Sequence, residues 1–175
     1  MDYWYVLFIT TGKEQEVETI LKILLDREMF SPFVPMLETA YRGGGKRGIE
    51  TKPMFPGYIF IETDLKSQEF RDKIWRTMYY LKDVYKVLRY GNSYDCMMRD
   101  DEKSTLLSLC GEDYYMEMSS GIIIGDKVYI KAGPLQGWES VIKKVDRHNR
   151  RAIIEIPIFG EMREVQVGLE IVEKI

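Results

Sequence analysis

A run of cations near the C-terminal end of the chain is the stretch best suited to bind another molecule. Residues 140–151, SVIKKVDRHNRR, contain five Lys or Arg residues, one acid and the chain's only histidine. On a strand–turn–strand these cations would gather around one hairpin tip, where they can contact phosphate groups. The candidate RNA-binding residues are Lys143, Lys144, Arg147, His148, Arg150 and Arg151. The alternative, that the charge only keeps a hairpin solvated, stays open.

A second basic stretch surrounds the glycine run RGGGKRG at residues 42–48. Its cations are Arg42, Lys46, Arg47 and, a little further on, Lys52. Three adjacent glycines predict a flexible hairpin tip that does not hold a compact conformation. Because flexible loops are often basic merely to stay solvated, solvation is the simpler explanation for this charge.

Residues that could carry catalysis do not assemble into a site. Metal binding needs a cluster of ligands, whereas Cys96 and Cys110 stand fourteen positions apart without a second pair. His148 is a poor general base, because neighbouring cations oppose its protonation. Lys46 follows three glycines but lacks the spacing and the Ser or Thr of a P-loop. We therefore expect a binding protein with no catalytic residues, no metal and no cofactor.

The segment FPGYIFIET, residues 55–63, combines a turn with a strand. Pro56 and Gly57 mark the turn, and the β-branched and aromatic residues after them predict the strand. Phe55 and Tyr58 flank the turn, so both rings are expected to be partly exposed. They either cap a core or form a docking surface for another molecule.

Strands and helices of the first half must position these residues. The apolar run WYVLFI predicts a strand buried on both faces at residues 4–9. TGKE at residues 11–14 fits a capping box, and apolar residues at helical spacing follow it. Further strands are expected at residues 33–41, 49–53, 58–63 and 84–90. A second helix is expected to begin at Ser67, and a third is expected over residues 100–109. The residues of the second helix that should point inward are Phe70, Ile74, Trp75 and Met78. Together these segments predict a small α/β sandwich with one sheet.

The character of the sequence changes after residue 110. Residues 111–121, GEDYYMEMSSG, are acidic and aperiodic, and they predict a linker. Residues 122–175 contain short strand-like segments separated by turns, which is typical of a small β-barrel. This part holds nine Lys or Arg against eight Asp or Glu, whereas residues 1–121 hold sixteen against twenty. The overall net charge of −3 therefore hides a slightly basic C-terminal part.

The composition is that of a globular protein of the cytoplasm. Two cysteines are too few for a disulfide-stapled secreted domain. The first ten residues lack a basic leader and a small-residue cleavage site, and no apolar run approaches the length of a membrane span. We expect a cytoplasmic monomer that does not bind membranes.

Two groups of motifs resemble one known family in the right order. WYVLFITTGKE and FPGYIFIE resemble the N-terminal (NGN) domain of NusG-type transcription elongation factors. GDKVYIKAGPLQGWESVIKKVD, followed by IEIPIFGEMREVQV, resembles the KOW domain of that family. The resemblance implies an α+β fold. An NGN α/β sandwich with a central, mostly antiparallel sheet would span residues 1–110, a linker 111–121, and a small KOW (SH3-like) β-barrel 122–175.

The resemblance also implies roles for residues of the turn. In NusG-type proteins the NGN domain holds the clamp helices of the largest RNA polymerase subunit in an apolar pocket. Phe55 and Tyr58 are then anchors for RNA polymerase, and Pro56 and Gly57 fix their turn. Trp4 either lines the same pocket or belongs to the core.

The KOW domain is implied to reach a second partner. Ile158, Phe159 and Gly160 match the loop through which NusG proteins touch a ribosomal protein or the termination factor Rho, although Phe159 could instead plug the barrel. The early TGKE, the stretch KKVDRHNRRAIIEI and the ending REVQVGLEIVEKI are most similar to the LoaP group of specialised antitermination paralogues. That similarity implies a factor for long operons whose basic hairpin binds a nascent RNA hairpin.

Two other functions stay open. A general NusG elongation factor, coupled to Rho or to the ribosome, would depend on residues 158–160 more than on the basic hairpin. A ribosome-associated structural protein would use the KOW barrel alone to bind ribosomal RNA, and would leave the FPGY turn without a purpose.

Overall fold

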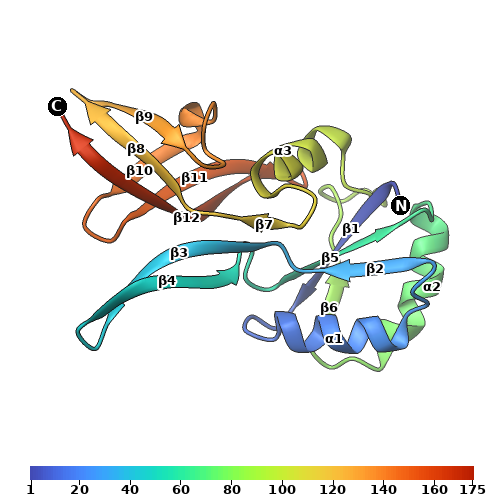
Figure 1. Ribbon diagram of the computed structural model, residues 1–175. Coiled ribbons are helices and arrows are strands. Elements are labelled where there is room, and N and C mark those ends of the chain that lie inside the picture. The colour runs from blue at the N-terminus through green and yellow to red at the C-terminus, as the bar shows by residue number, and fades with distance from the viewer. The chain divides into compact units, whose positions relative to one another are not determined.

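A four-stranded antiparallel sheet organises the N-terminal part of the chain. The computed structural model describes residues 1–175, except for the side chain of Lys46. The sheet has the order β2 (Phe30–Phe33), β5 (Tyr58–Thr63), β1 (Tyr3–Ile9) and β6 (Val84–Val87) (Figure 1). The strand predicted from the apolar run at residues 4–9 is confirmed as β1, which lies inside the sheet. A strand that is covered on both faces has apolar residues on both, which explains why this run does not alternate with polar residues.

Helix α2 (Ser67–Tyr79) covers one face of this sheet. Alternate residues of β1 point to opposite faces. Tyr5 lies on the face covered by α2, where its ring stacks on Phe70 with centroids 3.8 Å apart. The expectation that Trp75 points inward is wrong: Trp75 is 68% exposed, whereas Phe70 and Ile74 are buried. The inward stripe of α2 is therefore narrower than the sequence pattern predicts.

The other two α-helices confirm the predicted segments. α1 (Glu14–Leu24) contacts β2 and β5 and buries Val17 and Leu21, as its apolar spacing predicts. α3 (Asp100–Cys110) has three acids in its first turn, where the helix dipole favours them. Gly111 follows with φ +67°, which is the usual way for glycine to end a helix.

A long β-hairpin lies within the first expected part of the sequence, residues 1–110. β3 (Met36–Gly43) pairs with β4 (Lys46–Pro53) along its whole length. Gly44 and Gly45 form the two-residue turn with φ +57° and +76°, as a type I′ turn requires. The hairpin is confirmed, but the expectation that its glycines hold no compact conformation is wrong.

Residues 111–121, predicted as a linker, contain strand structure. β7 (Tyr115–Met116) pairs in parallel with β3, and β8 (Ser119–Ile124) begins within the same segment. The Glu38 carboxylate of β3 accepts hydrogen bonds from the Met118 amide at 3.0 Å and the Tyr115 hydroxyl at 3.1 Å. The segment is therefore tied to β3 by backbone and side-chain hydrogen bonds.

The C-terminal strands form a five-stranded sheet. Its order is β10 (Ile142–Asp146), β11 (Arg151–Ile158), β12 (Glu161–Lys174), β8 and β9 (Lys127–Ala132), with a short 3₁₀ turn, η1 (Glu139–Val141), before β10. β8 is antiparallel to β9 and parallel to β12. The predicted short strands are confirmed, whereas closure of this sheet into an SH3-like barrel stays a prediction.

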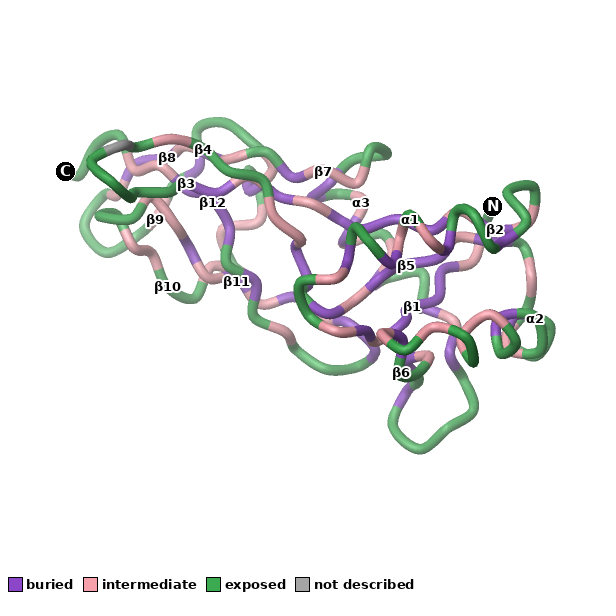
Figure 2. Tube along the Cα trace, turned by 90° about the horizontal axis from the view of Figure 1, so that it is seen from below, coloured by how far each residue is buried: buried purple, intermediate pink, exposed green. Residues whose placement is uncertain are grey.

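The chain forms two compact units that interleave along the sequence. The first comprises Met1–Pro35, Phe55–Lys103 and Ile158–Gly160, and the second Met36–Met54, Ser104–Pro157 and Glu161–Ile175. Figure 2 shows buried residues running along the strands, with exposed connecting loops. A mixed α/β fold is confirmed. The predicted division into residues 1–110 and 122–175 stays a prediction, because these units follow other boundaries.

Candidate functional site

The FPGY segment forms a type II turn at the start of β5. The Tyr58 amide donates to the Phe55 carbonyl at 3.2 Å, across Pro56 and Gly57. Gly57 has φ +87°, a conformation that such a turn needs at this position and that favours glycine. A Cβ at Gly57 would also meet Thr11 Oγ1 at 3.0 Å. Backbone geometry and lack of space therefore both require glycine here.

A buried carboxylate holds this turn in place. Glu14, the first residue of α1, is 4% exposed and accepts hydrogen bonds from the amides of Gly57 at 2.6 Å and Gly12 at 3.0 Å. The expected capping box is not what starts α1, since Lys13 is the N-cap and makes no side-chain cap bond. Sequence reasoning missed Glu14 as a support of the turn, because its partner lies 43 positions away.

Phe55 lies in the core of the first unit. Its ring centroid is 5.8 Å from that of Phe60 on β5, and the residue is 6% exposed. The expectation that both rings beside the turn are partly exposed is therefore wrong for Phe55. Tyr58 on the other side of the turn is half-buried, and Pro56 is exposed. Of the two expected anchors, only Tyr58 is partly accessible at the surface.

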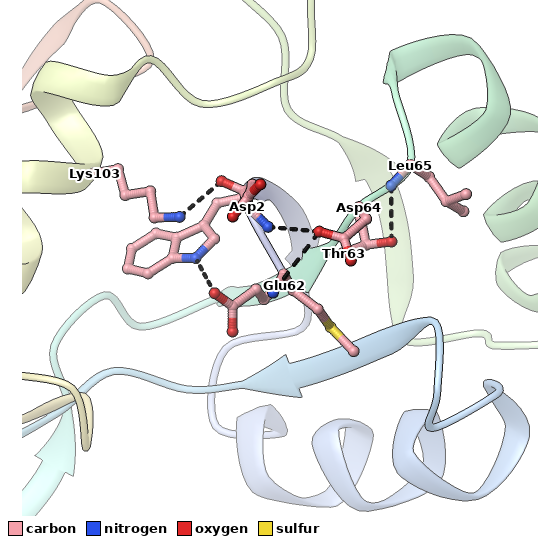
Figure 3. A network of polar contacts seen from close by, with 8 residues as sticks. Asp2, Glu62, Thr63, Asp64, Leu65 and Lys103 are labelled. Carbon is pink, nitrogen blue, oxygen red and sulfur yellow. Dashed lines mark hydrogen bonds and ion pairs between the residues drawn. The ribbon is translucent and has the colours of Figure 1, made fainter.

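Trp4 is also a core residue, which was one of the two alternatives that the sequence left open. It is 1% exposed, and its ring centroid lies 5.0 Å from that of Phe33 and 5.0 Å from Lys103 Nζ. Its indole N–H donates to the Glu62 carboxylate at 3.2 Å. Lys103 also donates to the Asp2 carbonyl at 2.7 Å, and Figure 3 shows Lys103, Asp2 and Glu62 around this end of β1. These contacts fix the ring from several sides.

An accessible group of aromatic rings lies at the other end of β1, on the same sheet face as Trp4. Phe8 is directly opposite Tyr58 in the β1–β5 ladder, with ring centroids 5.5 Å apart. Tyr85 of β6 is 57% exposed, and its ring lies 5.5 Å from Phe8 on the other side. We call Phe8, Tyr58 and Tyr85 the aromatic patch. Lys86 Nζ, 5.8 Å from the centre of the Phe8 ring, adds a cation beside it.

Tyr85 is held in the aromatic patch by its hydroxyl. Thr10 Oγ1 donates to the Asp83 carboxylate at 2.9 Å and lies 2.7 Å from the Tyr85 hydroxyl. Because the single proton of Thr10 is engaged with Asp83, the Tyr85 hydroxyl donates to Thr10. Sequence reasoning missed Phe8 and Tyr85. Alternation along β1 signals that Phe8 shares a face with Trp4, but placing Tyr85 needs the register of β6.

The loop matched to the KOW partner site is packed within the first unit. Ile158 and Phe159 are 3% and 5% exposed, and the Phe159 ring lies 4.9 Å from that of Tyr90. The Gly160 amide donates to Glu102 Oε1 at 2.7 Å, and the Tyr90 hydroxyl donates to Glu102 Oε2. Burial, and then the hydrogen bond to Glu102, raise the pKa of Tyr90. The loop therefore presents little apolar surface in this conformation.

The turn between β10 and β11 is ordered by one carboxylate. Asp146 accepts hydrogen bonds from the Asn149 amide at 3.0 Å and side chain at 2.7 Å, and these bonds lower the pKa of Asp146. Arg150 closes the turn with φ +53°. The only acid of the basic stretch is therefore engaged inside the turn.

The cations of this hairpin lie in two separate surroundings. Lys143 and Lys144 line one hollow together with Lys174, and Lys143 also pairs with Glu155 at 3.1 Å. A second hollow of about 230 Å³ is lined by cations of both basic stretches: Arg42, Arg47, His148, Arg150 and Arg151. We call this second hollow the hairpin groove. Arg147 is exposed on the turn. The structure thus unites two basic stretches that the sequence treated separately.

The described residues form neither a metal site nor a membrane-spanning helix. Among the described side chains, no group of three or more His, Cys, Asp and Glu could hold a metal ion. Cys96 and Cys110 are buried free thiols, and burial raises the pKa of Cys110 to about 12. None of the helices in the described part of the chain has the length and hydrophobicity to cross a bilayer.

Accessible aromatic and basic surfaces on a mixed α/β fold are features of a binding protein. The model of the family described as "Transcription termination factor nusG" matches residues 2–107, and the chain belongs to this NusG family. The transcription termination/antitermination protein NusG of Borreliella burgdorferi is 25% identical, over 98% of both chains. The NusG protein of Treponema pallidum is 26% identical over 98% of both. That of Thermus thermophilus is 23% identical over 95% of this chain and 94% of its own.

Family membership settles the question of catalysis. NusG-family proteins are transcription factors and not enzymes, so the expectation that this chain is not an enzyme is confirmed.

Proposed function

We propose that this chain is a specialised NusG-family elongation factor that keeps RNA polymerase processive and opposes termination. Binding to RNA polymerase is a common property of the family to which the chain belongs. The observation that carries the proposal is the aromatic patch, in which the half-buried Tyr58 follows the FPGY turn. Partly exposed aromatic rings on a rigid sheet are suited to anchor a protein partner.

The polymerase contact is assigned to the aromatic patch, with the clamp helices of the largest subunit as its partner. Tyr58, Phe8 and Tyr85 supply the accessible rings, and Lys86 supplies a polar rim. Phe55, Pro56, Gly57 and Trp4 have supporting roles in this proposal. Pro56 and Gly57 fix the turn, and Phe55 and Trp4 pack against Phe60, the next residue but one after Tyr58 on β5. In this assignment only the accessible rings touch polymerase directly.

A second partner is assigned to the loop of Ile158, Phe159 and Gly160. A ribosomal protein or Rho could reach this loop only after the Phe159 ring leaves Tyr90 and the Gly160 amide leaves Glu102. In this proposal, residues 122–175 form a KOW-type barrel that can present the loop in this way. Partner binding would then compete with the packing seen here.

The RNA contact is assigned to the β10–β11 hairpin, with a structured element of the nascent transcript as its ligand. Lys143, Lys144 and Arg147 are exposed on or beside the turn. Structured RNA is read mainly through its shape and its phosphates, which suits such cations. His148, Arg150 and Arg151, which line the hairpin groove, are assigned to the same RNA contact.

A general NusG factor is the second candidate function. It is favoured by the relatives themselves, since all three compared above are named transcription termination/antitermination protein NusG. Such a factor would act on most transcripts and would need no particular RNA element.

Transcription in vitro through a terminator tests the proposal and separates the two candidates. The template is used with and without the leader that naturally precedes the regulated genes. A specialised factor raises readthrough only with the leader, and K143Q/K144Q/R147Q removes that gain. Equal effects on both templates point to the general factor. No effect of the protein on either template, together with no binding to polymerase, would refute both.

A further inference from the structure

Hydrogen bonds join the tips of the two basic hairpins within the second unit. Arg151 Nε and Nη2 donate to the Ala40 carbonyl of β3 at 3.1 and 2.6 Å. Arg42 Nη1 lies 3.0 Å from His148 Nε2. Because arginine can only donate, His148 Nε2 accepts this hydrogen bond. The hairpin groove is therefore one surface built from both tips.

The positive charge of the hairpin groove is compensated on one side only. Arg150 pairs with Glu170 at 2.9 Å, and Arg151 lies 4.0 Å from Glu50. Arg42 and Arg47 have no such pairing: among the described side chains, neither forms an ion pair. No acidic residue lines the groove among the described side chains. The unbalanced charge therefore lies on the β3–β4 tip.

The register of the β3–β4 hairpin brings these two charges together. Arg42 is directly opposite Arg47, so both side chains project from the same face. Like charges placed directly opposite each other destabilise a sheet. A bound anion would offset this repulsion.

Solvation of a flexible loop does not explain this arrangement. The tip is a two-residue turn with defined glycine conformations, and its arginines line a hollow of about 230 Å³. The planar guanidinium also matches the geometry of phosphate better than an ammonium does. Two guanidinium groups that form no ion pair among the described side chains, placed beside one hollow, are suited to a phosphate-bearing ligand.

We propose that the hairpin groove binds the phosphodiester backbone of a nucleic acid, with Arg42 and Arg47 as the contacting residues. Arg151 and His148 position the two tips, since their hydrogen bonds lie between the hairpins. This inference rests on the RNA-binding part of the proposed function and extends it to β3 and β4. The ligand would cross both hairpins rather than the β10–β11 turn alone.

The test measures binding of the full chain and of R42Q/R47Q by fluorescence anisotropy at several salt concentrations. The probes are a labelled RNA hairpin with a stem of about 16 base pairs and a DNA duplex of the same sequence. Log affinity falls as log salt rises. Loss of two phosphate contacts should make this negative slope shallower by about two. The control K73Q/R76Q removes two exposed cations from α2, and its slope should equal that of the parent.

The outcomes separate this inference from the proposed function. An unchanged slope in R42Q/R47Q overturns the inference, and the proposed function survives if K143Q/K144Q/R147Q still weakens RNA binding. A loss seen only with DNA supports the groove as a phosphate site and refutes the RNA role. If polyglutamate competes as well as RNA does, the ligand is an acidic protein and the inference is wrong. Equal losses in R42Q/R47Q and in the control also overturn it.

Discussion

The Glu14 carboxylate lies 2.6 Å from the backbone nitrogen of Gly57, so the start of α1 and the turn before β5 share one buried hydrogen bond. Tyr58 follows Gly57 and pairs with Phe8 across the ladder. The position of the aromatic patch therefore depends on a carboxylate that is not part of it.

Replacement of Glu14 by alanine should destabilise the fold. The buried Gly57 amide would lose its acceptor, which costs about 1–3 kcal/mol in the free energy of unfolding. Urea denaturation measures this change. The control is E16A, because Glu16 is exposed and pairs with Lys13 on the surface, where ion pairs contribute little to stability. Equal effects of the two substitutions would contradict the role of Glu14.

Loss of the accessible rings should weaken polymerase binding without unfolding the protein. For Y58A/Y85A we expect a loss of at least about 2 kcal/mol of binding free energy, roughly thirtyfold in affinity. Binding to purified RNA polymerase is the measurement. W75A is the control, since Trp75 is an equally large ring that is 68% exposed on α2. Affinity equal to that of the parent in Y58A/Y85A would dismiss the aromatic patch as the anchor.

Replacement of Phe55 should affect stability first. Its ring is buried against Phe60, so F55A should lower the free energy of unfolding by about 3–5 kcal/mol. Polymerase binding, measured well below the unfolding midpoint, should fall less than in Y58A/Y85A. A stable F55A protein that has lost polymerase binding would restore Phe55 as a direct anchor.

Removal of Glu102 should release the loop of residues 158–160. The Gly160 amide would lose its acceptor, so its hydrogen exchange in E102A should become faster than in the parent. Binding of the loop's partner, tested with ribosomal protein and with Rho, should become stronger. The control is E161A, an exposed acid beside the same loop. Slow exchange retained in E102A would show that Glu102 does not hold the loop.

Alkaline pH should destabilise the protein through its buried thiol. Burial raises the pKa of Cys110 from 9.0 to about 12. Between these values the Cys110 thiol loses its proton more readily in the unfolded chain than in the folded one. Its contribution to the free energy of unfolding is therefore fully present below pH 9 and is lost as the pH rises toward 12. The urea midpoint should therefore drop between pH 8 and pH 10.5, and C110A should show a smaller drop. An equal drop in both proteins would exclude this cause.

Local signals in the sequence predicted the elements that depend on local physics. α1 follows from its apolar period, the β3–β4 hairpin from its glycines, and the FPGY turn from Pro56 and Gly57, whose allowed dihedral angles decide the turn type. β7 was missed because a strand of two residues has no period, and its pairing depends on β3. Short strands of this kind form only where a partner edge is present.

The candidate sites were predicted less completely, because their residues meet across the fold. Phe8 and Tyr85 join Tyr58 only through the register of three strands. Arg42 meets His148 across 106 positions, which no local pattern reveals. Phe55 was expected to be partly exposed because it stands beside a turn. Its ring instead packs against Phe60 of the strand that follows.

The pairing of β7 with β3 determines where the chain can be cut into fragments. A fragment that ends at residue 110 would lose β7 and the Met118 amide, and would leave the edge of β3 and the Glu38 carboxylate without their partners. An unpaired strand edge recruits strands from other molecules. Such a fragment should therefore self-associate, whereas one that extends through residue 118 keeps this edge covered.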